Sequence, residues 1–156
     1  MRIWFQLLRV TRVPPTPLHD MSEIVTPQQP QNTEAELIAV RREKLAKLRE
    51  LGIDPYGGRF QVSVTPADLR ANFSEGLQVK VAGRITALRD MGKSCFFQLS
   101  DVLGSIQGYM NVKALDETGV AAWKCLDRGD WIGIEGETFL TKTGEPTIKM
   151  EKFTVL

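Results

Sequence analysis

Residues 79–107, VKVAGRITALRDMGKSCFFQLSDVLGSIQ, decide the fold of this chain. Apolar and polar side chains alternate over three segments in and beside this stretch, residues 78–89, 94–101 and 104–112. Such alternation is typical of β-strands that bury one face, and a glycine lies in each intervening turn, where the chain must reverse. The stretch therefore predicts three consecutive antiparallel strands.

Two more segments with the pattern of strands follow, residues 131–140 and 146–155, and a Thr-Gly-Glu turn at 143–145 joins them. A helix is predicted before them, at about residues 115–126. Five strands with a helix between the third and the fourth are typical of the Greek-key oligonucleotide-binding (OB) fold. We therefore predict a mainly β, five-stranded OB-fold barrel over residues 78–156.

The inward faces of these strands and one face of the helix supply the predicted core. Its members are Val79, Val81, Ile85, Phe97, Leu99, Ile106, Ala122, Leu126, Ile132 and Ile134. Alternation places Phe96 and Phe97 on opposite faces, and we expect Phe97 inside and Phe96 outside. The alternative is that Phe96 also packs inside.

Residues 33–77 are predicted to form an N-terminal α-helix and a connector. Thr33 and Glu36 match a capping box, and Gly52 suits the left-handed C-cap of a helix ending near residue 51. Apolar side chains recur at helical spacing between these ends and predict one stripe, formed by Ile38, Leu45, Leu48 and Leu51. The connector ends in a second, short capped turn that begins at Thr65.

The other face of this helix is basic, and two interpretations remain open. Arg41, Arg42 and Lys44 suit contacts with a phosphate backbone. Alternatively, the face is merely solvated, with Glu43 and Lys47 forming an i,i+4 pair.

Residues 1–32 are predicted to be a disordered N-terminal extension, because a proline- and glutamine-rich tract of this kind cannot build a core. Gln6 and Arg9 interrupt the apolar start well below the length of a membrane span, so no membrane association is expected. Met21 offers an alternative start for a shorter chain.

Composition limits the chemistry that the chain can perform. A net charge of +1 means that any RNA site is a local patch rather than a global basic field. Two cysteines without a CxxC pair, and a single histidine, give neither a zinc site nor a disulfide framework, so we expect reduced core thiols and a cytoplasmic protein. The sequence shows no triad and no P-loop, and we interpret the carboxylate pairs Asp90 with Asp101 and Glu135 with Glu137 as turns or solvated faces.

Arg89, Phe96 and Gln107 place a cation, an aromatic ring and a bidentate amide on neighbouring strands. Reading of an unstacked RNA base requires side chains of these kinds. From the sequence alone, Arg89 is equally explained as a solubilising charge at a hairpin end and Gln107 as a surface polar residue.

Several segments together carry a family resemblance. They are RREKLAKLRELGIDPYG at 41–57, VAGRI at 81–85, MGK at 91–93, the pattern F-x-L-x-D-x-x-G-x-I-Q at 97–107 and TKTGE at 141–145. Residues 36–156 thereby resemble the N-terminal anticodon-binding domain of class II lysyl-tRNA synthetases. The resemblance implies binding of a tRNA with a lysine anticodon, whose central base is uracil.

The resemblance also implies roles for individual residues. Phe96 would stack on an anticodon base, Gln107 would pair with the edge of the uracil, and Arg89 would lie beside it. Glu145 would accept a hydrogen bond from a base N–H, although most turn glutamates only hold a solvated charge.

Backbone contacts are expected from Arg84, Lys93 and Lys142, each of which is otherwise an ordinary surface charge. The chain departs from many relatives at Leu88, where they carry a second basic residue. A flanking contact is therefore expected to be missing.

Class II synthetases bind ATP and Mg²⁺ in a catalytic domain, and the motifs of that domain are absent here. We therefore expect no catalytic residue, no metal site and no cofactor in this chain, and a homodimer only through a parent enzyme. Two other functions are retained: a general single-stranded nucleic-acid-binding OB-fold protein, and a dimerisation or interaction module.

Overall fold

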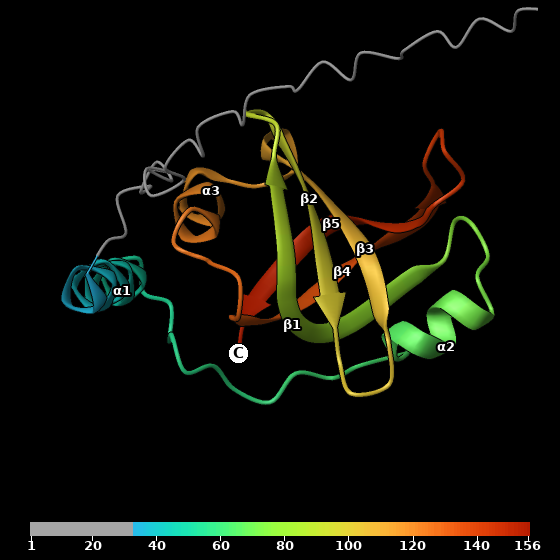
Figure 1. Cartoon of the computed structure of the whole chain (residues 1–156). Coiled ribbons are helices and arrows are strands. Elements are labelled where there is room, and N and C mark those ends of the chain that lie inside the picture. Colours follow the sequence, from blue (N-terminus) through green and yellow to red (C-terminus); the bar gives the residue numbers. More distant parts are fainter. Residues whose placement is uncertain (1–32) are drawn as a thin grey trace, which may run out of the picture. The chain divides into compact units, whose positions relative to one another are not determined.

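The computed structural model describes residues 33–156, which form one unit. The predicted disordered extension at 1–32 and the start at Met21 lie outside the described residues. The elements are α1 (Glu34–Glu50), α2 (Pro66–Ala71), β1 (Gln78–Asp90), β2 (Ser94–Ser100), β3 (Ser105–Asn111), a 3₁₀ turn (Val112–Ala114), α3 (Glu117–Trp123), β4 (Trp131–Leu140) and β5 (Pro146–Val155) (Figure 1). Among residues 33–156, no helix combines the length and the apolar character needed to span a bilayer.

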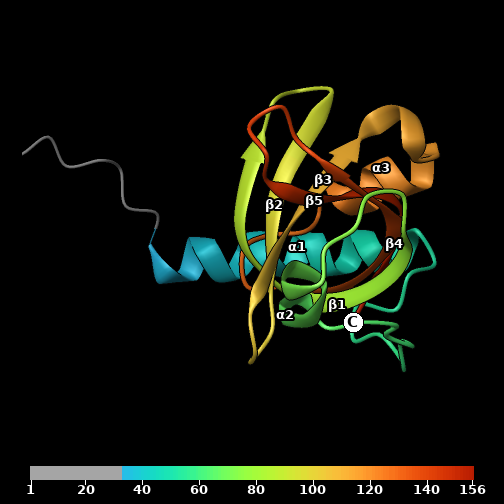
Figure 2. The same cartoon turned by 90° about the vertical axis from the view of Figure 1, so that its right-hand side faces the viewer.

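The five strands form a closed barrel in the order β1-β2-β3-β5-β4. All neighbours are antiparallel except β3 and β5, which pair in parallel through residues 107–109 and 147–149. Figure 2 shows the strands curving around this barrel, with α3 at one of its ends. The predicted mainly β OB-fold, with a helix between the third and fourth strands, is confirmed.

The ends of the helices are set by capping residues, several of which the sequence predicts. Thr33 and Glu36 make both bonds of the capping box, and Gly52, with φ of 73°, lets the chain leave α1 in the left-handed region. The helix α3 is shorter than predicted. Asp116 caps its N-terminus by accepting from Gly119 N at 2.6 Å, and the residues before it turn as a 3₁₀ helix.

All ten predicted core residues are buried. The barrel interior also contains residues that alternation alone did not single out, among them Met110, Ile148 and Met150. The predicted apolar stripe of α1 is only half correct. Leu48 is buried and Leu45 and Leu51 are half-buried, whereas Ile38, in the first half of α1, remains 44% exposed.

Phe97 lies inside the barrel against β3, and Gly108 is its register partner there. A Cβ atom at position 108 would overlap the Phe97 ring, whose other neighbour is Trp123 of α3 at 5.0 Å between centroids. The ring therefore occupies the space that any side chain at position 108 would need.

Gly108→Ala is expected to lower the free energy of unfolding by about 1–3 kcal/mol, because overpacking a filled core forces side chains off their rotamers. Urea denaturation measures this. Gly58→Ala is the matched control, since nothing lies within 4 Å of the added methyl group. Combining Gly108→Ala with Phe97→Leu should cost less than the sum of the two single changes, and simple additivity would show that the ring is not the obstacle.

Candidate nucleic-acid interface

One row of outward-facing side chains crosses four strands of the barrel. Arg89 of β1 pairs with Phe96 of β2, Phe96 with Tyr109 of β3, and Tyr109 with Lys149 of β5. Their sequence neighbours Cys95, Phe97, Gly108 and Ile148 are buried, so alternation turns this row toward solvent. The structure thus brings the predicted Arg89 and Phe96 together, with a second ring and a second cation in the same row.

Phe96, Tyr109 and Phe139 form an aromatic cluster on this outer face. The ring centroids of Phe96 and Tyr109 are 4.9 Å apart with an interplanar angle of 49°, and those of Tyr109 and Phe139 are 6.1 Å apart at 75°. All three rings are half-buried, so each keeps exposed surface while its orientation is restrained by a neighbour.

A second row adjoins the first and is polar, with two half-buried glutamines and one fully buried threonine. Gln98 of β2 pairs with Gln107 of β3, and Gln107 pairs with Thr147 of β5. Gln98 Nε2 donates to Ser105 Oγ at 2.9 Å, and Gln107 Nε2 donates to Thr147 Oγ1 at 2.9 Å. Both amides are therefore held on the protein surface beside the aromatic cluster.

Glu145 lies in the loop between β4 and β5, but its carboxylate already has a partner. Arg70 Nη1 of α2 donates to Glu145 Oε1 at 2.9 Å, and Thr141 Oγ1 accepts from the Glu145 backbone N at 3.0 Å. The ion pair is exposed, with 47% and 39% of the two side chains accessible, so water screens it. A base contact by Glu145 stays a prediction.

The predicted backbone contacts fall at different places. Lys93 and Lys142 are exposed in the β1–β2 and β4–β5 turns, at the tips of hairpins. Arg84 is five residues from Arg89 along β1, and its Nε donates to Gly129 O at 3.0 Å. Five strand residues span roughly 17 Å, so Arg84 lies well away from the aromatic cluster.

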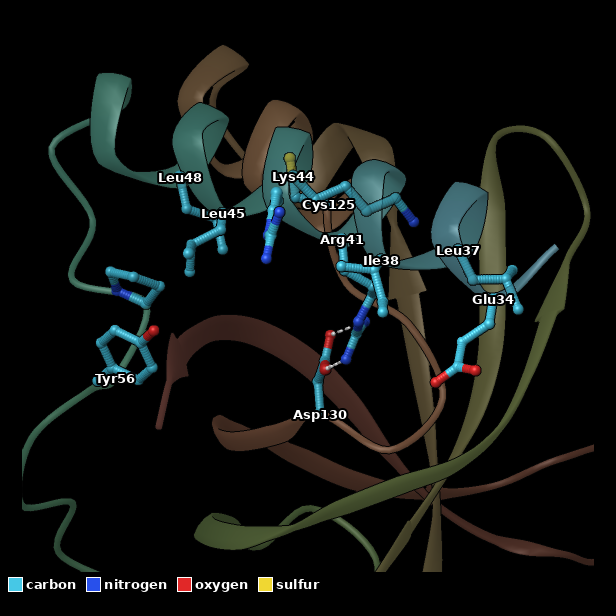
Figure 3. Close-up of a pocket in the computed structure, with 12 residues that line it drawn as sticks. Glu34, Leu37, Ile38, Arg41, Lys44, Leu45, Leu48, Tyr56, Cys125 and Asp130 are labelled. Atoms are coloured by element: carbon cyan, nitrogen blue, oxygen red, sulfur yellow. Dashed lines mark hydrogen bonds and ion pairs between the residues drawn. The ribbon is translucent and has the colours of Figure 1, made fainter. Parts of the chain in front are cut away.

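Arg41 and Lys44 of α1 pair with the loop between α3 and β4. Arg41 donates to Asp127 Oδ2 at 2.8 Å and to Asp130 Oδ1 at 2.6 Å, and Lys44 Nζ lies 2.6 Å from Asp127 Oδ1. Figure 3 shows the Arg41 guanidinium facing the Asp130 carboxylate at the edge of a hollow of about 470 Å³. These ion pairs dock α1 on the barrel, and phosphate contacts by Arg41, Lys44 and the exposed Arg42 stay predictions.

The ion pair predicted between Glu43 and Lys47 is wrong. Lys47 Nζ lies 3.6 Å from Glu50 Oε2, one turn toward the C-terminus, rather than against Glu43. Both side chains are more than half exposed, and such a pair contributes little to stability.

The ion pairs between α1 and the α3–β4 loop change the pKa values of Asp127 and Arg41. Burial alone would raise the pKa of Asp127, but hydrogen bonds from Lys44 and Arg41 outweigh it and hold that pKa below its ordinary value. Hydrogen bonds to Asp130 and Asp127 raise the pKa of Arg41. The Asp127 carboxylate therefore stays charged, and its contacts with Arg41 and Lys44 are electrostatic.

Three other carboxylates of the described residues make structural contacts. Asp90 accepts from Gly92 N at 2.7 Å and Asp101 from Gly104 N at 2.8 Å, so both stabilise turns. Glu135 pairs with Lys80 across β4 and β1 at 2.7 Å, which lowers the pKa of the Glu135 carboxyl. Within residues 33–156, no group of three or more potential metal ligands lies together.

The sequence analysis gave no role to Tyr109 or Phe139 and missed Gln98 and Thr147. The alternation of β3 contains the signal for Tyr109, because it shares a face with Gln107. Nothing local marks Thr147, since its place beside Gln107 depends on the parallel pairing of two strands that are far apart in sequence.

The model of a family described as OB-fold nucleic acid binding domain, named for the tRNA anticodon, matches residues 79–156. The lysine–tRNA ligase of Pelotomaculum thermopropionicum is 43% identical over 123 residues, covering 78% of this chain and 24% of the ligase. Those of Carboxydothermus hydrogenoformans and Listeria monocytogenes are 42% and 39% identical, over 78% and 76% of this chain and 25% and 26% of theirs. The chain thus spans about a quarter of the length of the curated relatives it matches.

Asp127→Asn is expected to loosen α1 while leaving the barrel folded, because it removes the carboxylate that Arg41 and Lys44 share. Amide hydrogen exchange should become faster in α1 and stay unchanged in β1–β5. Since the pKa of Asp127 is lowered on folding, its contribution is complete above the ordinary value of 3.8 and is lost as the pH falls through the lowered pKa.

Glu50→Gln is the control for this measurement, because it removes an ion pair confined to α1. Unchanged exchange in α1 of Asp127→Asn would mean that apolar contacts around Leu48 suffice for docking.

Proposed function

We propose that the outer face of the barrel binds the anticodon of a tRNA. The premise is that the chain belongs to the tRNA-anticodon family of OB-fold nucleic acid binding domains. The observation that carries this proposal is the row formed by Arg89, Phe96 and Tyr109. It combines a cation with rings on which splayed bases stack, as recognition of single-stranded RNA requires.

Phe96 provides the stacking surface in this proposal. Its ring is half-buried and is restrained by Tyr109, so little rotational freedom is lost when a base stacks on it. Arg89, opposite Phe96 in the β1–β2 ladder, approaches the same base and donates to a carbonyl or a phosphate. Each base stacked on a ring contributes about 1–3 kcal/mol.

The anticodon proposed is that of lysine, on the strength of relatives named lysine–tRNA ligase. Its central uracil offers an N–H between two carbonyl groups, and the amide of Gln107 matches this edge by accepting and donating together. Glu145 is proposed to accept from another base N–H, with Arg70 released or shared.

Phosphate contacts are proposed for Lys93 and Lys142 at the hairpin tips, with smaller contributions from Arg84, Arg41, Arg42 and Lys44. Contacts of this kind position the RNA without reading its sequence. They also make affinity fall as salt is added, because bound cations are released from the phosphates.

The wider setting is part of the proposal. We propose that residues 33–156 bind RNA without activating an amino acid, and that ATP and Mg²⁺ act in another part of a lysine–tRNA ligase. A cytoplasmic location and a homodimer of that whole enzyme complete the proposal. A chain that catalyses lysine-dependent exchange of pyrophosphate into ATP would contradict the first statement.

Fluorescence anisotropy at low salt tests the base preference, using a lysine-anticodon stem-loop and the same hairpin with cytidine for the central uridine. We expect tighter binding of the uridine hairpin. Equal binding of both, and of unrelated oligonucleotides, would favour a general single-strand binder. Binding of neither, with a dimer in sizing experiments, would favour an interaction module.

Phe96→Ala is expected to weaken binding of the lysine-anticodon hairpin by about tenfold or more, from the loss of one stacking contact. The thermal transition should remain cooperative, because Phe96 lies outside the core. Tyr56→Ala is the control: it removes an exposed ring far from the row, 73% accessible, and should leave affinity unchanged. Intact folding with intact affinity in Phe96→Ala would remove stacking from the proposal.

A further inference from the structure

Three oxygen and nitrogen atoms form a short hydrogen-bonded chain at the edge of the proposed interface. Gln107 Nε2 donates to Thr147 Oγ1 at 2.9 Å, and Thr147 Oγ1 donates to the backbone carbonyl of Glu145 at 3.0 Å. The Thr147 side chain is fully buried, so water does not compete for its hydroxyl. The same Glu145 carbonyl also accepts from Thr141 N at 3.1 Å.

The direction of donation along these two hydrogen bonds is set at Glu145 O, where the series ends. A carbonyl oxygen only accepts, so the single hydroxyl hydrogen of Thr147 must point at Glu145 O. The Thr147 oxygen then has only lone pairs to offer to Gln107, and the group facing it must be the NH₂ of the amide. A flipped amide would either set two oxygen lone pairs against each other or, if the Thr147 hydroxyl turned to Gln107, take the Thr147 bond away from Glu145 O, so it makes at least one hydrogen bond fewer.

The amide of Gln107 therefore presents its oxygen away from Thr147. Among residues 33–156, no group donates a hydrogen bond to Gln107 Oε1. On the outer face of the barrel, Gln107 lies diagonally across from Phe96, since Phe96 pairs with Tyr109 and Gln98 with Gln107. Diagonal neighbours on one face of a sheet have Cα atoms roughly 7–8 Å apart, within reach of one stacked base.

We propose that Thr147 is a positioning residue that fixes the orientation of the Gln107 amide and thereby sets its preference for uracil over cytosine. The proposal rests on the function proposed above, in which Gln107 meets the edge of a base stacked on Phe96. Uracil carries a hydrogen on N3, which an oriented Gln107 Oε1 accepts, while the second hydrogen of Nε2 is free for a carbonyl of the base.

Cytosine carries a lone pair on N3, which opposes the same oxygen. A freely rotating amide escapes this repulsion by turning over, so that Nε2 donates to N3 and Oε1 accepts from the exocyclic amine. An unrestrained glutamine can therefore pair with either base and discriminates poorly between uracil and cytosine. Stacking on Phe96 hinders the base from sliding to a new register, and Thr147 hinders the amide from flipping, so the two restraints act together.

The test compares the ratio of affinities for the uridine and cytidine hairpins in Thr147→Val, Thr147→Ser and the unaltered chain. Thr147→Val keeps the shape of the side chain and removes the hydroxyl, while Glu145 O keeps its bond from Thr141 N. We expect the ratio to fall by about tenfold, mainly through tighter binding of the cytidine hairpin. Thr147→Ser restores the hydroxyl and should restore most of the ratio.

A purely structural role of Thr147 would weaken both hairpins equally and leave the ratio unchanged, which would overturn the proposal. If Thr147→Val lacks a cooperative thermal transition, Thr147→Ala against Thr147→Ser makes the same comparison at lower temperature. Gln107→Ala separates the proposed role of Thr147 from the proposed reading of a base by Gln107. A ratio lost in Gln107→Ala but kept in Thr147→Val rejects the role of Thr147 alone, whereas a ratio unaffected in Gln107→Ala also rejects base reading by Gln107.

Discussion

The parallel pairing of β3 with β5 is the constraint on which the rest of this structure depends. It closes the barrel through residues 107–109 and 147–149, in a ladder much shorter than the antiparallel ones. Inside the barrel, the Phe97 ring fills the space at the middle of β3, which explains Gly108. With Phe97 fixed inside, alternation leaves Phe96 on the outer face beside Arg89 and Tyr109.

The same pairing connects the core to the interface. The ring centroids of Phe97 and Trp123 are 5.0 Å apart and those of Trp123 and Phe153 are 5.4 Å apart, in tilted and edge-on geometry, so Trp123 of α3 joins β2 to the end of β5. On the other side of β3, Gln107 meets Thr147 and Tyr109 meets Phe96. Interior rings thus hold the backbone that carries the exterior ones, and such rigid support is what preorganises a binding site.

Much of this could be predicted from the sequence, because a period of two along each strand reports directly which residues face the core. The five strands, the ten core residues and the opposite orientations of Phe96 and Phe97 all follow from that period. What escaped prediction depends on contacts between distant segments. Thr147 meets Gln107 only after the barrel closes, and Arg41 meets Asp127 across 86 residues of chain. Local patterns contain no information on either pairing.

The ion pairs that hold α1 and the hydrogen bond that holds Gln107 differ in how strongly salt and pH affect them. Ion pairs between α1 and the α3–β4 loop are partly exposed, at 51% for Arg41 and 37% for Asp127, so salt and pH weaken them. The bond from Gln107 to Thr147 ends on a fully buried hydroxyl, and neither salt nor pH near neutrality changes it. The ion pairs hold α1 on the α3–β4 loop, whereas the bond to Thr147 holds Gln107 within the barrel itself. The orientation proposed for Gln107 therefore depends on a buried contact of the barrel, whereas the docking of α1 depends on partly exposed charges.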